Sequence, residues 1–168
     1  MINEDTENLP VNVTGVVNIK HFNGDGNLIN EIEIPNAVVE LGLKYIACRL
    51  AGSSSCDNPP SHMALGTSGA ANVSSGGVVT NTALGGELAS RRQVTSVVDG
   101  QNFRAVVFST TFEANTATGA IQEAGIFNNG TTGTVGAPSG VMLARTTFPV
   151  INKQATDSLA VTWKITLS

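Results

Sequence analysis

The strongest constraint on the fold is a strict alternation of side chains near the C-terminal end of the chain. Apolar residues occupy every second position, at Leu159, Val161, Trp163, Ile165 and Leu167. The intervening positions hold Ala160, Thr162, Lys164 and Thr166. Because successive side chains of a β-strand point to opposite faces, this pattern predicts a strand with Trp163 and its apolar neighbours in a core. The opposite face is expected to be exposed or to lie at an interface.

The composition extends this expectation to most of the chain. The 168 residues include 18 glycines, 18 threonines, 16 asparagines and 13 serines, whereas only 13% are charged and 5% aromatic. A helical bundle would be richer in Leu, Glu, Lys and Arg, and a disordered chain would hold fewer Val, Ile and Leu. Threonine and valine favour strands, while glycine and asparagine favour tight turns. We therefore expect an all-β domain with weakly charged surfaces.

Short segments with strand character follow one another along the chain. An acidic hairpin is expected over 11–35 around a turn at 23–27, with further strands at 62–67, 92–98, 103–112, 121–127 and 141–148. The dipeptide Asp99-Gly100 predicts a tight hairpin, and Pro149 is expected to close the strand before it. Residues 82–89 are expected to form one short helical turn.

One segment has helical periodicity. Apolar residues at Val39, Leu43, Ile46 and Leu50 predict a helix at about 37–51. Asn36 is its expected N-cap, and Gly52 is expected to end it. The expected architecture is therefore a β-sandwich or jelly-roll-like fold with one helix, an extended N-terminal arm at 1–10 and a single domain at 11–168.

Acidic residues gather at the N-terminal end. Residues 1–40 contain seven acids and one base, and the arm carries Glu4, Asp5 and Glu7. Because nucleic acid requires a basic footprint, we do not expect it as a partner. The first residues lack the basic and apolar regions of a secretory signal, and no stretch is apolar enough to span a bilayer, so no membrane partner is expected. The pair Arg91-Arg92 is interpreted as the solvated start of a strand.

The candidate metal ligands are few. Seven residues separate Cys48 from Cys56, which leaves room for a disulfide, but without an export signal we expect free thiols. A metal held by both cysteines would need further ligands, and His62 is the only nearby candidate. Three turn residues imitate the first ligands of a calcium loop: Asn23, Asp25 and Asn27. The glycine and the final glutamate of such a loop are missing, so we expect a plain turn and no metal.

Groups suited to catalysis are equally few. His21 and His62 are the only histidines, and neither belongs to a nucleophile motif. Glu31 and Glu33 share one strand face, which is typical of a solvated side. We therefore expect no enzymatic activity and no cofactor.

Two charges stand alone within otherwise apolar strands. Glu123 lies in the segment IQEAGIF, and Arg145 lies in the segment VMLARTTF. Burying a charge without a partner is costly. We therefore predict that Glu123 and Arg145 pair with each other, and that the pair serves register and assembly rather than catalysis.

The order of several short motifs is similar to that of a known group of proteins. The motifs are NAVVELGLKYIACRL, HMALGTSG, TNTALGGEL, FSTTF, IQEAGIFNN, GVMLARTTFPV and SLAVTWKITLS, and they cover about residues 36–168. This series resembles tailed-bacteriophage virion proteins, namely capsid decoration (cement) proteins and the related collar domains of tail fibres. The resemblance implies a β-sandwich component of the virion that has no enzymatic activity and works as a homo-oligomer.

From this resemblance we expect a decoration protein that binds the outside of the phage head and bridges capsid subunits. Its partners would be the major capsid protein and its own copies, as a trimer, and it would be made in the host cytoplasm and reside on the capsid surface. The arm residues Glu4, Asp5 and Glu7 are candidates for contacts with the capsid or a neighbouring subunit. Because Ser168 follows directly on a core strand, we expect a capsid protein rather than a whole tail fibre. The alternatives are a tail collar, baseplate or fibre-attachment domain, and a receptor- or glycan-binding module.

Overall fold

The computed structural model describes residues 12–101, 104–134 and 136–168. The arm expected at 1–10, with Glu4, Asp5 and Glu7, lies outside the described residues. The elements follow in the order β1 (Val13–Phe22), β2 (Leu28–Val38), α1 (Glu40–Leu50), β3 (His62–Gly66), β4 (Ser74–Ser75), β5 (Val78–Val79), β6 (Arg92–Gln93), β7 (Thr95–Val98), β8 (Ala105–Phe112), β9 (Gly119–Phe127), β10 (Met142–Lys153) and β11 (Ser158–Leu167). The prediction of an all-β fold with a single helix is confirmed for this part of the chain.

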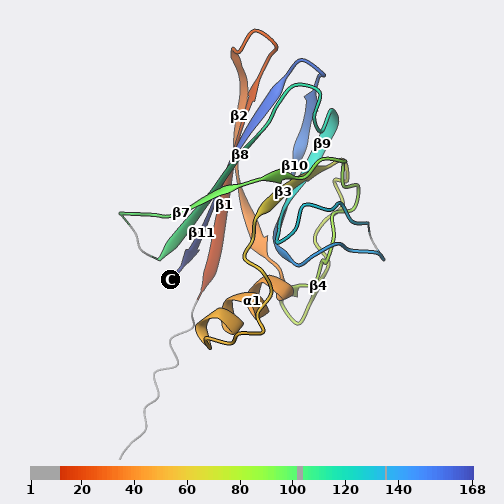
Figure 1. The fold of residues 1–168 in the computed structure, drawn as a ribbon. Coiled ribbons are helices and arrows are strands. Elements are labelled where there is room, and N and C mark those ends of the chain that lie inside the picture. The colour runs from red at the N-terminus through yellow and green to blue at the C-terminus, as the bar shows by residue number, and fades with distance from the viewer. Residues whose placement is uncertain (1–11, 102–103, 135) are drawn as a thin grey trace, which may run out of the picture.

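Nine strands form one antiparallel sheet in the order β6-β3-β9-β10-β2-β1-β11-β8-β7. Strand β2 belongs to both halves of this sheet. Its residues up to Asn36 pair with β1, whereas Ala37 and Val38 pair with β10. The sheet therefore turns a corner within β2. It folds into layer A (β2-β1-β11-β8-β7) and layer B (β6-β3-β9-β10), and α1 lies across one end of the strands (Figure 1).

A second corner joins the two layers on their other side. The consecutive strands β6 and β7 separate here, since β6 pairs with β3 in layer B and β7 pairs with β8 in layer A. Between them, the N–H of Val94 donates to the carbonyl of Ser61 at 2.9 Å. The hydroxyl of Thr110 in β8 donates to the carbonyl of Gln93 at 2.8 Å. The sheet is thus nearly closed, and the sandwich-like architecture predicted from the sequence is confirmed.

The main apolar core lies between the layers. The alternation near the C-terminal end is observed, since Leu159, Val161, Trp163 and Ile165 of β11 are all buried. Trp163 is fully buried and stands in register between Phe108 of β8 and Val17 of β1. The same alternation leaves Thr162 exposed on the outer face of layer A.

A smaller apolar cluster lies on the outer face of layer B. Ala64, Phe127 and Met142 project from β3, β9 and β10 into this cluster. Val39, at the start of the helix, and Leu84, in the connection between β3 and β6, complete it. Layer B is therefore covered on both of its faces.

The helix begins later than the sequence pattern predicts. Asn36 remains in β2 opposite Gly15, and its buried carboxamide makes no hydrogen bond among the described residues, so it is not a helix cap. Val39 is the N-cap residue, and its N–H donates to the carbonyl of Leu143 in β10 at 3.1 Å. Pairing with β10 thus keeps the chain extended up to this residue. The predicted end of the helix is confirmed, because Gly52 follows it with a φ of +64°.

Two other boundaries also differ from expectation. Pro149 lies within β10, where the register with β9 shifts between Thr147 and Ile151, and such an irregularity accommodates a residue without an N–H group. Residues 82–89 contain turns but no helix. The backbone N–H groups of Gly85 and Gly86 donate to the side-chain carboxylate of Glu123 in β9 instead of forming helical hydrogen bonds.

Candidate functional site

Glu123 of β9 and Arg145 of β10 form a buried ion pair. One carboxylate oxygen of Glu123, Oε2, accepts hydrogen bonds from Arg145 Nη2 at 2.8 Å and from Nε at 3.2 Å. Their side chains are 0% and 1% exposed, respectively. The structure therefore brings together the two lone charges that were selected from the sequence.

Loops covering layer B supply the remaining hydrogen bonds of this pair. The carboxylate of Glu123 also accepts the backbone N–H groups of Gly86 at 2.7 Å and Gly85 at 3.0 Å. The guanidinium of Arg145 donates to the side chain of Asn72 at 2.6 Å and to the carbonyl of Ala70 at 3.0 Å. Because charge-assisted hydrogen bonds are stronger than neutral ones, the pair fixes both loops on the sheet.

Close packing explains the glycines of the motifs ALGT and ALGG. A Cβ atom on Gly66 would lie 2.5 Å from the Glu123 carboxylate and 2.8 Å from the carbonyl of Gly86. A Cβ atom on Gly85 would lie 2.6 Å from the hydroxyl of Ser68. These distances are shorter than real carbon contacts allow, so the loops reach the carboxylate only because these positions lack side chains.

A second buried ion pair lies nearby and was missed in the sequence. Arg91 donates to Glu87 from Nε at 2.6 Å and from Nη2 at 2.9 Å, and its guanidinium stacks 3.6 Å from the centre of the Phe127 ring. It also donates to the carbonyls of Asn129 and Ser139. The interpretation of Arg91 as part of a solvated strand start is therefore wrong. The spacing of four residues between Glu87 and Arg91 is the only local signal of this pair.

Residues of the two pairs and of the loops around them come from four of the seven motifs in residues 36–168. HMALGTSG contains Gly66, TNTALGGEL contains Gly85 to Glu87, IQEAGIFNN contains Glu123 and Phe127, and GVMLARTTFPV contains Arg145. Every charged group of the two pairs accepts or donates at least two hydrogen bonds. Such satisfied pairs specify a conformation and hold loops in place, which is a structural role.

A third buried polar cluster joins the beginning and the end of the sheet. His21 Nε2 of β1 lies 2.9 Å from Asp157 Oδ2 in the turn before β11, and both side chains are buried. The backbone N–H of Gln154 is the main reason that the pKa of Asp157 lies below its ordinary value, and the hydrogen bond with His21 lowers it further. His21 therefore links β1 to the turn before β11.

Lys153 lies beside this cluster and is fully buried. Its ammonium group donates to the carbonyls of Asp157 at 2.6 Å and Glu113 at 3.1 Å. Burial lowers the pKa of Lys153, although the negative charges of the same two residues oppose this shift. The second histidine, His62, accepts or donates a hydrogen bond with Ser61 at 2.9 Å, and burial followed by the charge of Arg91 lowers its pKa.

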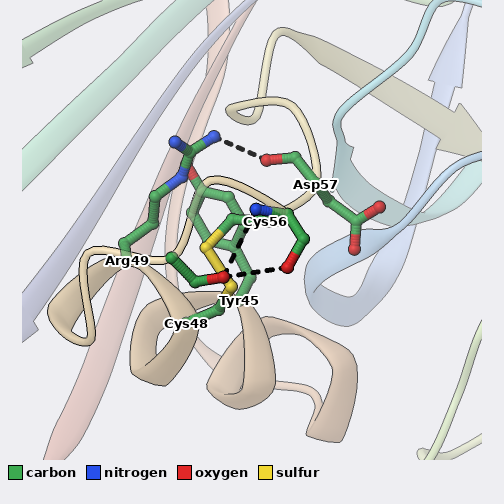
Figure 2. Close-up of a disulfide and its surroundings, with 7 residues drawn as sticks. Tyr45, Cys48, Arg49, Cys56 and Asp57 are labelled. Atoms are coloured by element: carbon green, nitrogen blue, oxygen red, sulfur yellow. Dashed lines mark hydrogen bonds between the residues drawn. A yellow bond between two sulfur atoms is a disulfide. The ribbon is translucent and has the colours of Figure 1, made fainter.

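Cys48 and Cys56 form a disulfide, so the expectation of free thiols is wrong. The bridge ties α1 to the loop that follows it (Figure 2). Arg49 strengthens the same connection, because it donates to the carbonyl of Asp57 and to the hydroxyl of Tyr45 and stacks on the Tyr45 ring. The spacing of the cysteines permits this bond, and the expectation of free thiols rested on the redox surroundings of the chain rather than on geometry.

The other candidate ligands occupy ordinary turn and surface positions. The side chain of Asn23 accepts the N–H groups of Asp25 and Asn27, which closes the β1–β2 turn. Glu31 and Glu33 are exposed on β2, as expected, and Glu31 lies 3.7 Å from Lys20. Within residues 12–101, 104–134 and 136–168 no group of three or more His, Cys, Asp or Glu side chains could hold a metal ion.

No helix in the described part of the chain combines the length and hydrophobicity needed to span a bilayer. Comparisons of the chain with protein-family models, with curated proteins and with solved structures yield no match.

Proposed function

We propose that this chain is a non-enzymatic decoration protein of a tailed-phage head, which binds the outer surface as a homotrimer and bridges capsid subunits. The ordered motifs of residues 36–168 provide the family resemblance behind this proposal. The observation that carries it is the broad, exposed outer face of layer A, which offers a surface suited to packing against other protein.

Two rows of side chains cross this face from strand to strand. The first row consists of Thr95, Ser109, Thr162 and Asn18, and the second of Val97, Val107, Lys164 and Val16. Each of these residues is exposed or half-buried. Residues directly opposite each other on neighbouring strands share one face, so the two rows form a continuous surface. Lys164, which is bonded to Asp99, is the one charge among these eight residues, and the exposed Glu33 of β2 continues the first row beyond Asn18.

Such a surface is suited to association at low cost. Small neutral side chains lose less rotamer freedom than lysine or glutamate when an interface forms, and they leave no unpaired charge behind. Each contact would be weak, but a symmetric oligomer that engages several capsid subunits at once gains affinity through multivalency.

The buried charges support a scaffold rather than a catalyst. The carboxylate side chains of Glu87, Glu123 and Asp157 are buried, and each accepts hydrogen bonds from the surrounding structure. The disulfide between Cys48 and Cys56 fits a particle that acts outside the host cell, because disulfides persist in oxidising surroundings.

The proposal is tested by mixing the purified protein with heads that lack decoration. Saturable co-sedimentation with the heads and greater resistance of the heads to heat are expected. Binding only to tails or to host cells would instead indicate a collar or receptor-binding role and would overturn the proposal. A stable monomer in a solution mass measurement would contradict the trimer.

A matched pair of variants tests the outer face of layer A. Thr162→Arg places a long charged side chain in the middle of this face, and Ser75→Arg places the same side chain on the exposed strand β4. Thr162→Arg is expected to weaken binding to heads several-fold, whereas Ser75→Arg is expected to bind like the wild type. Equal affinities for the two variants, with circular dichroism showing that both are folded, would remove this face from the interface.

A further inference from the structure

An apolar cavity of about 270 Å³ lies between the two layers, at the end of the strands that α1 crosses (Figure 1). Its inner wall belongs to the main core, since Phe108 of β8, Leu143 of β10 and Ile165 of β11 line it. Tyr45 and Ile46 of α1 form another wall. The helix therefore covers part of the apolar interior at this end of the domain.

The loop at 52–60, which follows the helix, supplies a further part of this cover. Pro59 and Pro60 line the same cavity. Neither residue has a backbone N–H group with which it could bond to a neighbouring element. Their position therefore depends on the residues on either side of them. On the far side, the N–H of Ser61 donates to the carbonyl of Phe127 in β9 at 2.8 Å, which fixes that end of the loop on layer B.

On the side of the helix, the disulfide between Cys48 and Cys56 holds the loop (Figure 2). Arg49 also donates a hydrogen bond to the carbonyl of Asp57. Arg49 and Asp57 are both exposed, so water competes for this hydrogen bond and its net contribution is small. The covalent bond is therefore the main link that keeps the loop next to the helix.

The disulfide can be reached from solvent. Cys48 and Cys56 are each half-buried, and they line a separate hollow of about 210 Å³ together with the exposed residues Ser55 and Asp57. A small thiol reagent can therefore approach the sulfur atoms without unfolding the domain. In exchange with a dithiol, the S–S bond breaks, two electrons and two protons pass to the cysteines, and the dithiol closes to a cyclic disulfide.

We infer that the disulfide between Cys48 and Cys56 is a redox-controlled latch on the apolar cavity. While the bridge is closed, it keeps Pro59 and Pro60 over the cavity. When a dithiol reduces the bridge, the loop at 52–60 loses its covalent link to α1 and moves away from it, so the cavity opens to solvent. Exchange with an oxidised dithiol reverses this step. Cytosolic thiols keep such a bridge reduced and oxidising surroundings close it, so the surroundings decide whether this end of the core is covered.

Dye binding by the full-length protein tests this inference, which does not depend on the capsid proposal. The protein is reduced with dithiothreitol well below its melting temperature, and thiol titration verifies the reduction. The fluorescence of 8-anilinonaphthalene-1-sulfonate, which binds exposed apolar surface, is expected to rise several-fold and to return after re-oxidation. The emission maximum of Trp163, the only tryptophan, is recorded without dye and is expected to stay unchanged, because Trp163 is buried in the main core.

Either of two results would overturn the inference. Dye fluorescence that does not rise on reduction would show that the loop stays in place without the bridge. A shift in the emission of Trp163 would show that reduction unfolds the whole domain instead of opening one end of it.

Two variants separate an open latch from a general loss of stability. Cys48→Ser with Cys56→Ser removes the bridge permanently and is expected to bind dye like the reduced wild type. Gly66→Ala crowds the Glu123 carboxylate and lowers stability while the bridge remains closed, so it is expected to bind dye like the oxidised wild type. Equal dye fluorescence in the two variants would contradict the latch.

A second matched pair locates the dye. Ser96 of β7 is exposed and lines the cavity, so Ser96→Glu places a negative charge at its opening. Added to the double serine variant, Ser96→Glu is expected to lower binding of the anionic dye several-fold. Ser75→Glu, on the exposed strand β4, adds the same charge at a position that does not line the cavity and is expected to leave dye binding unchanged. Equal dye binding with either change would place the dye elsewhere and would overturn the inference.

Discussion

Glu123 and Arg145 stand one diagonal step apart on neighbouring strands. In the register of β9 and β10, Glu123 lies opposite Thr147 and Arg145 lies opposite Gly125. Diagonal neighbours on one face of an antiparallel pair are within reach of a long side chain. Two charges separated by 22 residues therefore meet because of the strand register. The loop that covers them then donates backbone hydrogen bonds to the carboxylate of Glu123.

Removing one member of this pair is expected to be strongly destabilising. Arg145→Met leaves the Glu123 carboxylate buried without its cation, which costs about 3–5 kcal/mol of the free energy of unfolding. The double variant Arg145→Met with Glu123→Gln is expected to be more stable than the single one, because the neutral amide can still accept the N–H of Gly86. Urea denaturation of both variants measures this coupling. If the free energy of unfolding of Arg145→Met lay within about 0.5 kcal/mol of the wild-type value, the ion pair would not contribute to stability.

The close approach at Gly66 gives a second prediction. Gly66→Ala forces a Cβ atom against the Glu123 carboxylate and the carbonyl of Gly86, and overpacking of this kind costs about 1–3 kcal/mol. Gly100→Ala is the matched control, because a Cβ atom there meets no atom within 4 Å. Thermal unfolding of the two variants should separate them, and equal melting temperatures would mean that the loops can move aside.

The disulfide predicts a stability that depends on redox conditions. A closed loop of about eight residues contributes about 2 kcal/mol by restricting the unfolded chain. A reducing agent is therefore expected to lower the melting temperature of the wild type. The double variant Cys48→Ser with Cys56→Ser should already unfold at the lower temperature and should not respond to the reducing agent. A wild type that is insensitive to complete reduction, verified by thiol titration, would contradict this role.

The buried carboxylate of Asp157 predicts an acid-dependent loss of stability. Its pKa lies below the ordinary value of 3.8, so the folded state binds its proton less readily than the unfolded state. The stabilisation is therefore fully present above the ordinary value and is lost as the pH falls through the lower pKa of the folded state. The free energy of unfolding of Asp157→Asn, measured with urea between pH 2 and 6, is therefore expected to fall less at acid pH than that of the wild type. Asp25→Asn, in an exposed turn, is the control, and its free energy of unfolding should fall as in the wild type.

The strands could be predicted where their side chains alternate between core and solvent. Leu159 to Leu167 show this alternation, and so do the inward residues of β1. The start of the helix could not be predicted in the same way. Asn36 has the chemistry of an N-cap, but its position in β2 is decided by pairing with strands far away in the sequence.

The same distinction applies to the candidate site. Glu123 and Arg145 could be selected because each is the only charge in its apolar segment, IQEAGIF or VMLARTTF. Glu87 and Arg91 lie in a polar segment, and their burial depends on loops that fold over Phe127, so no local pattern reveals it. The bond between Cys48 and Cys56 depends on the helix end and the next loop meeting, which the spacing allows but does not require.

The corners at β2 and at β6–β7 also govern how copies of this protein behave when crowded. An open sheet ends in long strands whose unpaired N–H and C=O groups recruit further strands, which leads to aggregation. Here the sheet ends in β6 and β7, which are two and four residues long. These two terminal strands therefore offer a neighbouring chain only a few unpaired groups to which it could add a strand.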